Sequence, residues 1–206
     1  MVINFLGKNL KMFNGIIYNI GIVKIITKTR NSIYLGIQTG INFKQKDIGE
    51  SVSCDGICLT IVKIKKKIIY FYISKETLNR SNFNLLKENQ IINLERSLLY
   101  GKSISGHFIQ GHVDGVAKIK KINFLDKSWL IKFQILDKKL NKFLMEKASI
   151  SINGVSLTIS KVNKNFFEIF VIPHTLKLTN LKNLRIKSLV NVELDIISKY
   201  IYKYSN

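Results

Sequence analysis

The sequence contains one seven-residue stretch twice. Residues 55–61, DGICLTI, return 98 positions later as residues 153–159, NGVSLTI. The register continues at the same spacing in the pairs Ser51 and Ser149, Lys63 and Lys161, Thr77 and Thr175, Asn82 and Asn180, Asn93 and Asn191, and Glu95 and Glu193. A unit this long, present in only two copies, is not typical of a solenoid. The repeat therefore predicts two like domains that arose by an internal duplication.

Each copy has the pattern of an all-β domain. Asp-Gly and Asn-Gly are the dipeptides that tolerate the positive φ of a two-residue hairpin turn, and β-branched residues flank both. The other segments are short, rich in Ile, Val, Tyr and Phe, and the one proline is Pro173. We predict a small antiparallel barrel for each copy. Helix is predicted only in residues 81–86 and 179–184 and in the tail, whose apolar stripe is Ile197, Tyr200, Ile201 and Tyr204.

The repeat and the flanking segments divide the chain into four parts. Residues 1–11 form an N-terminal extension, 12–97 the first barrel, 98–195 the second barrel and 196–206 a C-terminal helix. No apolar run approaches the roughly 18 residues of a membrane span, and Lys8 and Lys11 interrupt the start before a secretory segment develops. We expect a cytoplasmic protein without a membrane partner. Cys54 and Cys58 are accordingly interpreted as thiols.

The charge of the chain raises the question of nucleic-acid binding. The formal net charge is +20, and a basic surface attracts phosphate. The positive charge is nearly all lysine, however, because arginine, the residue best suited to bidentate base or phosphate contacts, occurs only at Arg30, Arg80, Arg96 and Arg185. We therefore expect a solvated lysine surface and no nucleic-acid partner.

The repeated motif separates apolar from small polar side chains. On a strand, Ile57 and Leu59 share one face and Cys58 and Thr60 share the other. The second copy repeats this division, with Val155, Leu157 and Ile159 opposite Ser156 and Thr158. Such a polar face either contacts solvent or lines a concavity. Solvent faces elsewhere are rich in lysine and the small polar pair recurs, so we favour a concavity for a planar ligand with many acceptors.

Seven motifs, in order, resemble those of riboflavin synthase of the α-chain type. They are MFNGII, GESVSCDGICLTI, NLERSL, GHFIQGHVDG, SINGVSLTI, VIPHTL and VNVELD, and they cover residues 12 to about 200. The resemblance implies a transferase that moves a four-carbon unit between two molecules of 6,7-dimethyl-8-ribityllumazine. The products are riboflavin and 5-amino-6-ribitylamino-uracil, and neither a cofactor nor a metal is needed.

The resemblance also implies an architecture and a site. Family members fold as two six-stranded antiparallel Greek-key barrels and assemble as homotrimers. Each site holds two substrates between the N-terminal barrel of one subunit and the C-terminal barrel of its neighbour. Backbone groups of the lining strands would pair with the pteridine edge, and side chains would hold the ribityl hydroxyls.

By position, the resemblance assigns residues to each pocket. The N-barrel pocket would use Gly15, Ile16, Ile17, Ser51, Cys58, Leu59, Thr60, Tyr72, Ile73, Ser74, Lys75, Glu76 and Thr77. The C-barrel pocket would use Gly111, His112, Val113, Lys147, Ser156, Leu157, Thr158, Ile172, Pro173, His174, Thr175, Leu176 and Lys177. The candidates for proton transfer and polarisation are His112, Cys58, Ser51, Ser156, Thr158 and Asp195, with His112 and Cys58 first.

Several of these candidates have a structural alternative. On a regular strand, His107 and His112 would face opposite sides, so one of them would be structural unless Gly111 forms a bulge. Cys58 could be an inert packed thiol, and Asp195 could cap the C-terminal helix. No spacing of His and Cys supports a metal site.

The whole chain has a second interpretation and departs from the family pattern in places. The same frame occurs in non-catalytic proteins that hold a lumazine or a flavin. Here both copies keep the small polar pair, which favours the enzyme. Residues 1–11 precede the family's usual start, Asn14 replaces a threonine, and the short tail predicts a weaker trimer.

Overall fold

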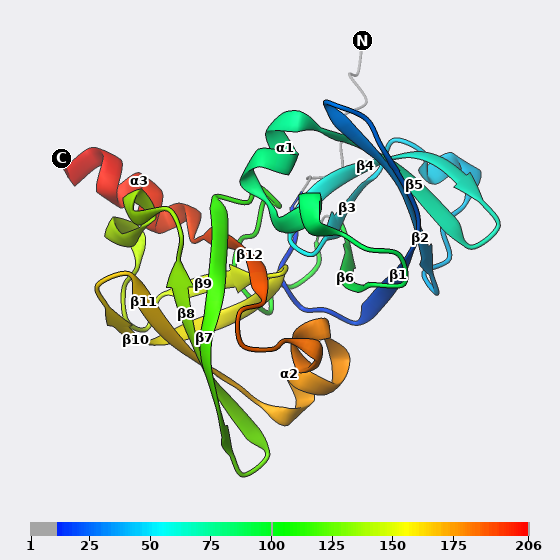
Figure 1. The fold of residues 1–206 in the computed structure, drawn as a ribbon. Helices are drawn as coiled ribbons and strands as arrows, with labels where there is room; N and C mark the ends of the chain where they lie inside the picture. Colours follow the sequence, from blue (N-terminus) through cyan, green and yellow to red (C-terminus); the bar gives the residue numbers. More distant parts are fainter. Residues whose placement is uncertain (1–11, 100, 206) are drawn as a thin grey trace.

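Residues 12–99 and 101–205 are described in the computed structural model, where they form two closed barrels lying side by side (Figure 1). The first barrel consists of β1 (Asn19–Lys28), β2 (Ser32–Thr39), β3 (Ser51–Cys54), β4 (Ile57–Lys65), β5 (Ile68–Ser74) and β6 (Ile91–Arg96). The second consists of β7 (Gly115–Leu125), β8 (Ser128–Ile135), β9 (Ser149–Ile152), β10 (Val155–Asn163), β11 (Phe166–Val171) and β12 (Leu189–Leu194). The predicted extension, residues 1–11, lies outside the described residues.

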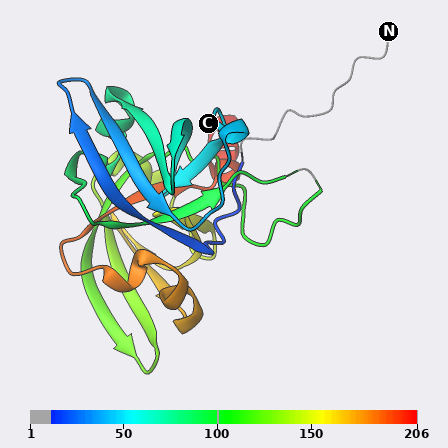
Figure 2. The same cartoon turned by 90° about the vertical axis from the view of Figure 1, so that its right-hand side faces the viewer.

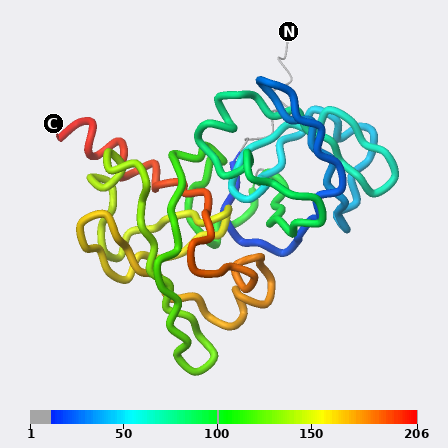
Figure 3. Tube along the Cα trace, viewed as in Figure 1, coloured from blue at the N-terminus to red at the C-terminus, as the bar shows by residue number. Residues whose placement is uncertain are grey.

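The two barrels share one topology. The first closes in the order β1-β2-β5-β4-β3-β6 and the second in the order β10-β11-β8-β7-β12-β9. In the first barrel β3, β4 and β5 follow one another, and β6 returns to lie beside β3, which is a Greek key. The prediction of two six-stranded antiparallel barrels is confirmed. Figure 3 traces the chain through one barrel and then the other, and Figure 2 shows the hairpin of β7 and β8 extending beyond its barrel.

The alternation predicted for the motif strand is also confirmed. Ile57, Leu59 and Ile61 of β4 are at most 4% exposed and belong to the core of the first barrel. Cys58 is half-buried and Thr60 is exposed on the other face. Strand β10 follows the same pattern in the second core, where Leu157 is only partly buried.

The repeated turns form the junction between the barrels. Gly56 and Gly154 have φ angles of +81° and +79°, and a Cβ placed on Gly56 would lie 2.7 Å from the backbone nitrogen of Gly154. The two turns therefore pack backbone against backbone, which only glycine permits at this spacing.

Buried amides cross the same junction. The Nδ2 group of Asn93 donates to the carbonyl of Asn153, and the Nδ2 group of Asn191 donates to the carbonyl of Asp55, both at 2.9 Å. Asn180 Nδ2 donates to Asp55 Oδ1, also at 2.9 Å. All five residues are at most 5% exposed. A buried polar network satisfied in this way favours one relative placement of the two barrels.

A short helix follows β5 in the first barrel and β11 in the second. In the first, α1 (Lys75–Arg80) precedes the 3-10 turn η2 (Asn82–Leu85); in the second, α2 (Pro173–Leu178) precedes η4 (Asn180–Asn183). The predicted helical segments correspond to η2 and η4. Helices α1 and α2 were not predicted; Ser74 accepts from the amide of Thr77 and Pro173 occupies the first turn of α2, and both features start helices.

The C-terminal helix was predicted correctly. Helix α3 (Ile196–Ser205) packs Tyr202 edge-on against Phe143 of η3 (Lys138–Phe143), with 5.2 Å between ring centres. Its apolar stripe is exposed: Ile197, Tyr200, Ile201 and Tyr204 are each more than half accessible. One further 3-10 turn, η1 (Gln45–Asp47), precedes β3.

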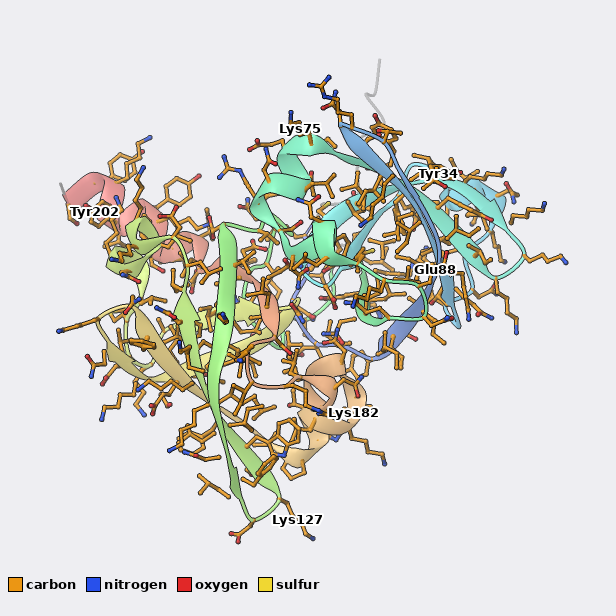
Figure 4. The ribbon with its side chains drawn as sticks, in the orientation of Figure 1. Tyr34, Lys75, Glu88, Lys127, Lys182 and Tyr202 are labelled. Carbon is orange, nitrogen blue, oxygen red and sulfur yellow. The ribbon has the colours of Figure 1, made fainter. Side chains whose placement is uncertain are left out.

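Lysines dominate the outer surface of both barrels. Lys75, Lys127 and Lys182 are labelled in Figure 4, and the Nζ atom of Lys182 turns back to donate to the carbonyl of Lys177 at 3.4 Å. All three residues are exposed. Within the described ranges, no helix is both long enough and apolar enough to cross a membrane.

Candidate functional site

Each barrel is preceded by a short segment that contacts the motif strand of the other barrel. We call these segments, residues 14–17 and 110–113, the exchanged segments. Residues 15–17 were predicted to line the same pocket as Cys58, and residues 111–113 the same pocket as Ser156. In the structure, the carbonyl of Gly15 accepts the amide of Ser156 at 2.9 Å, and the carbonyl of Gly111 accepts the amide of Cys58 at 2.8 Å. Each segment therefore lies on the motif strand of the other barrel, and the predicted grouping is corrected accordingly.

The two glycines permit this close contact. Gly15 and Gly111 have φ angles of +74° and +76°. A Cβ on Gly15 would lie 2.6 Å from the backbone nitrogen of Ser156, and one on Gly111 would lie 2.5 Å from Cβ of Cys58. Any other residue would be strained and would push the segment away from the motif. The repeat could not reveal the exchange, because two segments equivalent by duplication carry the same pattern.

The first candidate site is a cavity of about 210 Å³ at the motif of the N-terminal barrel. Its lining residues are Ile57, Cys58, Glu76, Thr77, Arg80, Gly111, His112 and Val113. Most of these were predicted, although Gly111, His112 and Val113 had been assigned to the other pocket. His112 is exposed at this cavity.

Arg80 lines this cavity and was not predicted. Its Nε atom lies 2.5 Å from Oε1 of Glu76, one turn earlier on α1. Both side chains are more than half exposed, so the pair contributes little to stability and can exchange partners with a ligand. The sequence did contain a signal for this pair, because Glu76 and Arg80 are four residues apart and arginine is rare in this chain.

Two further polar groups lie on the strands of this barrel. Ser51 is 4% exposed and pairs with Thr60 across β3 and β4. Within the described residues its Oγ is buried without a hydrogen-bond partner. Cys54 is fully buried, and this burial raises the pKa of its thiol well above the ordinary value, whereas Cys58 is only half-buried.

The second candidate site is a serine and histidine pair at the motif of the C-terminal barrel. Ser156 Oγ lies 2.8 Å from His107 Nδ1. Burial lowers the pKa of His107, and the charge of Asp195 opposes this effect. A neutral imidazole in this position can accept a proton. Among the described residues, His107 Nε2 is buried without a partner.

The connector between the barrels brings the two histidines to different sites. The sequence predicted that one of them is structural if the strand is regular, unless Gly111 forms a bulge. Residues 97–99 and 101–114 contain no strand, only an isolated bridge between Phe13 and Ile109, and Gly111 turns the chain with a positive φ. His107 reaches Ser156 and His112 reaches the cavity at Cys58. The motif GHFIQGH, with both histidines beside a glycine, was the signal for His107.

Asp195 caps the C-terminal helix. Its Oδ1 accepts the amide of Ile197 at 2.9 Å, and its carbonyl accepts the hydroxyl of Ser198 at the same distance. The structural alternative for this residue is therefore confirmed. Its carboxylate also acts on His107, so the cap lies within electrostatic reach of the second site.

The remaining predicted residues divide by exposure. Core residues, whose side chains are at most 9% exposed, could reach a ligand only through their backbone: Ile17, Leu59, Ile73, Val113 and Leu176. The exposed ones are Tyr72, Ser74, Lys75, Lys147, Thr158, Ile172, Pro173, His174 and Lys177, and Ile16, Leu157 and Thr175 are intermediate. Of the residues in this paragraph, Val113 lines the cavity at Cys58, and the others are not among the residues that line this cavity in the described part of the chain.

A larger cavity lies away from both motifs' polar faces. It measures about 720 Å³, and Asp55, Asn82, Asn153 and Asn180 at the barrel junction are among its lining residues. None of the predicted site residues lines it. In residues 12–99 and 101–205, no group of three or more His, Cys, Asp or Glu side chains is arranged to hold a metal ion.

Comparison with known proteins gives consistent matches. A family model described as Lumazine binding domain matches residues 14–97 and again 110–195. Riboflavin synthase of Photobacterium leiognathi is 35% identical over 93% of this chain and 88% of that protein. The riboflavin synthase of Buchnera aphidicola is 37% identical, covering 92% of each chain, and that of Bacillus subtilis is 34% identical, covering 94% of this chain and 89% of its own.

Solved structures show the same fold. LumP in complex with 6,7-dimethyl-8-(1'-D-ribityl) lumazine has a TM-score of 0.77 at 28% identity, covering 88% of this chain and 98% of LumP. LumP in complex with riboflavin has a TM-score of 0.78 at 28% identity, covering 89% of this chain and 99% of LumP.

Proposed function

The chain belongs to the riboflavin synthase family, whose members carry two lumazine-binding domains, and from this premise we propose that it converts two molecules of 6,7-dimethyl-8-ribityllumazine into riboflavin and 5-amino-6-ribitylamino-uracil. The reaction moves a four-carbon unit from one lumazine to the other, so the protein is a transferase. Matches to full-length riboflavin synthases across both barrels support this function.

One observation carries the proposal. Two like barrels each present a small polar residue, Cys58 or Ser156, beneath the backbone of a glycine at positive φ. Each motif also has its own histidine. A reaction between two copies of one molecule needs two similar binding sites, and this duplication supplies them. We propose that one lumazine binds at each motif.

The solved LumP complexes support the choice of ligand. LumP holds a lumazine and riboflavin on a frame that superposes on this chain along nearly its whole length. We infer that this protein binds the same two ligands, as substrate and product. Backbone groups of the exchanged segments would pair with the edge of the ring, and the exposed side chains of Thr60, Thr158 and Lys147 would hold hydroxyl groups.

The chemistry relies on positioning and proton transfer. Holding two rings face to face makes a bimolecular step effectively intramolecular, which can lower the barrier by about 7 to 11 kcal/mol. We propose His107, hydrogen-bonded to Ser156, as a base for a lumazine in the C-terminal barrel. His112 and Cys58 would act on the lumazine of the N-terminal barrel, with Ser51 as a polarising hydroxyl. Asp195 would tune His107.

The complete site requires a second subunit. A cavity of about 210 Å³ is smaller than the 300 to 1,000 Å³ of most small-molecule sites. We propose a homotrimer in which the N-terminal barrel of one subunit faces the C-terminal barrel of its neighbour. The exposed apolar stripe of α3 is a suitable contact for this assembly. We also propose that the reaction takes place in the cytoplasm.

A turnover assay tests this function. The purified protein is mixed with the lumazine, and the riboflavin formed is followed by its absorbance. We expect one riboflavin for every two lumazines consumed. Tight binding of the lumazine without formation of riboflavin would instead identify a non-catalytic binding protein.

A further inference from the structure

A buried glutamate in the N-terminal barrel holds one of the exchanged segments. Glu95 lies on β6 and is 7% exposed. Its Oε1 accepts the backbone amide of Asn14 at 2.8 Å, and its Oε2 accepts that of Gly15 at 3.0 Å. One carboxylate thus binds two successive amides immediately before the contact with Ser156.

The C-terminal barrel repeats this arrangement. Glu193 on β12 is 3% exposed, and its two oxygens accept the amides of Gln110 at 2.8 Å and Gly111 at 2.9 Å. The carbonyl of the same Gly111 accepts the amide of Cys58. The glutamate therefore stands in one barrel, and the segment it holds covers the motif of the other.

A carboxylate suits this task better than any neutral side chain. Two neighbouring amides need two acceptors, and only an ionised carboxyl offers both oxygens as acceptors. Burial removes competing water and raises the pKa of each glutamate to about 7, while the amide bonds lower it. The glycine in each segment has no side chain, so at that position the segment is held by its backbone bonds, whereas Ile17 and Val113 pack into the barrel cores further along.

We propose that Glu95 and Glu193 are positioning residues for the two substrate sites, and that each one acts on the site of the opposite barrel. The positioning of sites rests on the proposed function, whereas the crossed contact can be measured without turnover. Glu193 would hold residues 110–113 over Cys58, and Glu95 would hold residues 14–17 over Ser156. The two sites of a chain are then linked, because each barrel contributes the group that shapes the other site.

The reactivity of Cys58 reports this effect directly. Glu193→Gln keeps the shape of the side chain but turns one acceptor into a donor that faces an amide. The covering segment loosens, and we expect the rate of Cys58 alkylation by iodoacetamide to rise at least threefold. Glu95→Gln should leave this rate unchanged, although Glu95 is in the same barrel as Cys58. Alkylation at each thiol is followed by peptide mass spectrometry.

Two controls separate local from global effects. Cys54 is fully buried in the same barrel, so its alkylation reports unfolding. Glu88→Gln removes the same charge at an exposed position, labelled in Figure 4, and should match the wild type at both thiols. If Glu193→Gln does not fold, Glu193→Asp, which is one methylene shorter and cannot reach both amides, is measured in the same way.

The outcome decides between positioning and general stability. An unchanged Cys58 rate in the Glu193 variant overturns the proposal, as does an equal rise at Cys54 or a rise at Cys58 in Glu95→Gln. In turnover, both glutamine variants should lose at least tenfold in kcat, since displacements of about 1 Å can cost about a hundredfold. If the wild-type protein shows no turnover, the proposed function is refuted. The alkylation rate of Cys58 then still tests the crossed contact by itself.

Discussion

At the scale of single residues, the two copies differ at their candidate sites and at the junction between the barrels. The sequence drew attention to Cys58 and Ser156, and the structure adds their surroundings: Arg80 lines the first site, while His107 contacts the second. The junction is uneven as well, because Asp55 matches Asn153 in the other copy. Two identical substrates must act as donor and acceptor, and we propose that these differences supply the asymmetry between their sites.

Asp55 should make stability depend on pH. Burial raises its pKa to about 8, against the lowering effect of hydrogen bonds from Asn93 and Asn180. In the unfolded chain the pKa is about 4, so between these values the folded state holds the extra proton. The stability from this shift is complete below about pH 4 and is lost as pH rises through 8. Between these pKa values, Asp55 should lower the free energy of unfolding of the wild type by at most about 1.4 kcal/mol per pH unit. We expect Asp55→Asn to abolish this decrease.

Urea unfolding at pH 5 and pH 7 measures this difference. The wild type should lose more unfolding free energy between the two values than Asp55→Asn does. The mirrored variant Asn153→Asp, at a residue 3% exposed, should make the loss larger. Equal pH slopes for the wild type and Asp55→Asn would show that this carboxyl is ionised in the folded protein across the range.

At the scale of elements, the segments outside the strands shape both sites. Residues 12–17 and 108–113 pair with each other through Phe13 and Ile109 and then continue to opposite barrels. The connector that follows β6 brings His107 to the second motif and His112 to the first. The barrels form the frame, and we propose that these connectors supply both histidines to the reaction.

His107 and Ser156 should act as one unit. We expect His107→Ala and Ser156→Ala each to lower kcat by about a hundredfold or more, while lumazine affinity changes less than tenfold. The double variant should be about as slow as either single one, because the hydrogen bond joins them. Steady-state rates and fluorescence titration of bound lumazine measure the two effects. If the factors by which the two single variants lower kcat multiply in the double variant, the two side chains act independently.

At the scale of the whole molecule, the proposed trimer can be tested by mixing. His112→Ala disables the site of the N-terminal barrel, and His107→Ala that of the C-terminal barrel. If each reaction site joins two subunits, a mixed trimer contains pairs in which both halves are intact. Random exchange of equal amounts should restore about a quarter of the wild-type rate.

The activity of the mixture is compared with that of each variant alone, after exchange has been verified by mass spectrometry of tagged subunits. A mixture that exchanges fully and stays as slow as its parts would place each reaction site within one chain. The exposed stripe of α3, with Tyr200 and Ile201, is the surface proposed to hold the subunits together.

The sequence by itself determined the repeat, the barrels and the family. Strand alternation and turn dipeptides are local, so Ile57 to Ile61 could be assigned to faces without knowing their neighbours. The short helices were predicted only in part. Ser74 and Pro173 can end a strand or start a helix, and the contacts that select the helix lie outside any local window.

Only the tertiary structure decided which segments meet. A duplicated chain carries equivalent signals in both copies, so residues 15–17 fitted either motif equally well on sequence grounds. Hydrogen bonds from Cys58 to Gly111 and from Ser156 to Gly15 settle the choice. The pair of His107 with Ser156, 49 positions apart, arises in the same way. Such contacts depend on how two barrels pack across a junction, which no spacing along one chain encodes.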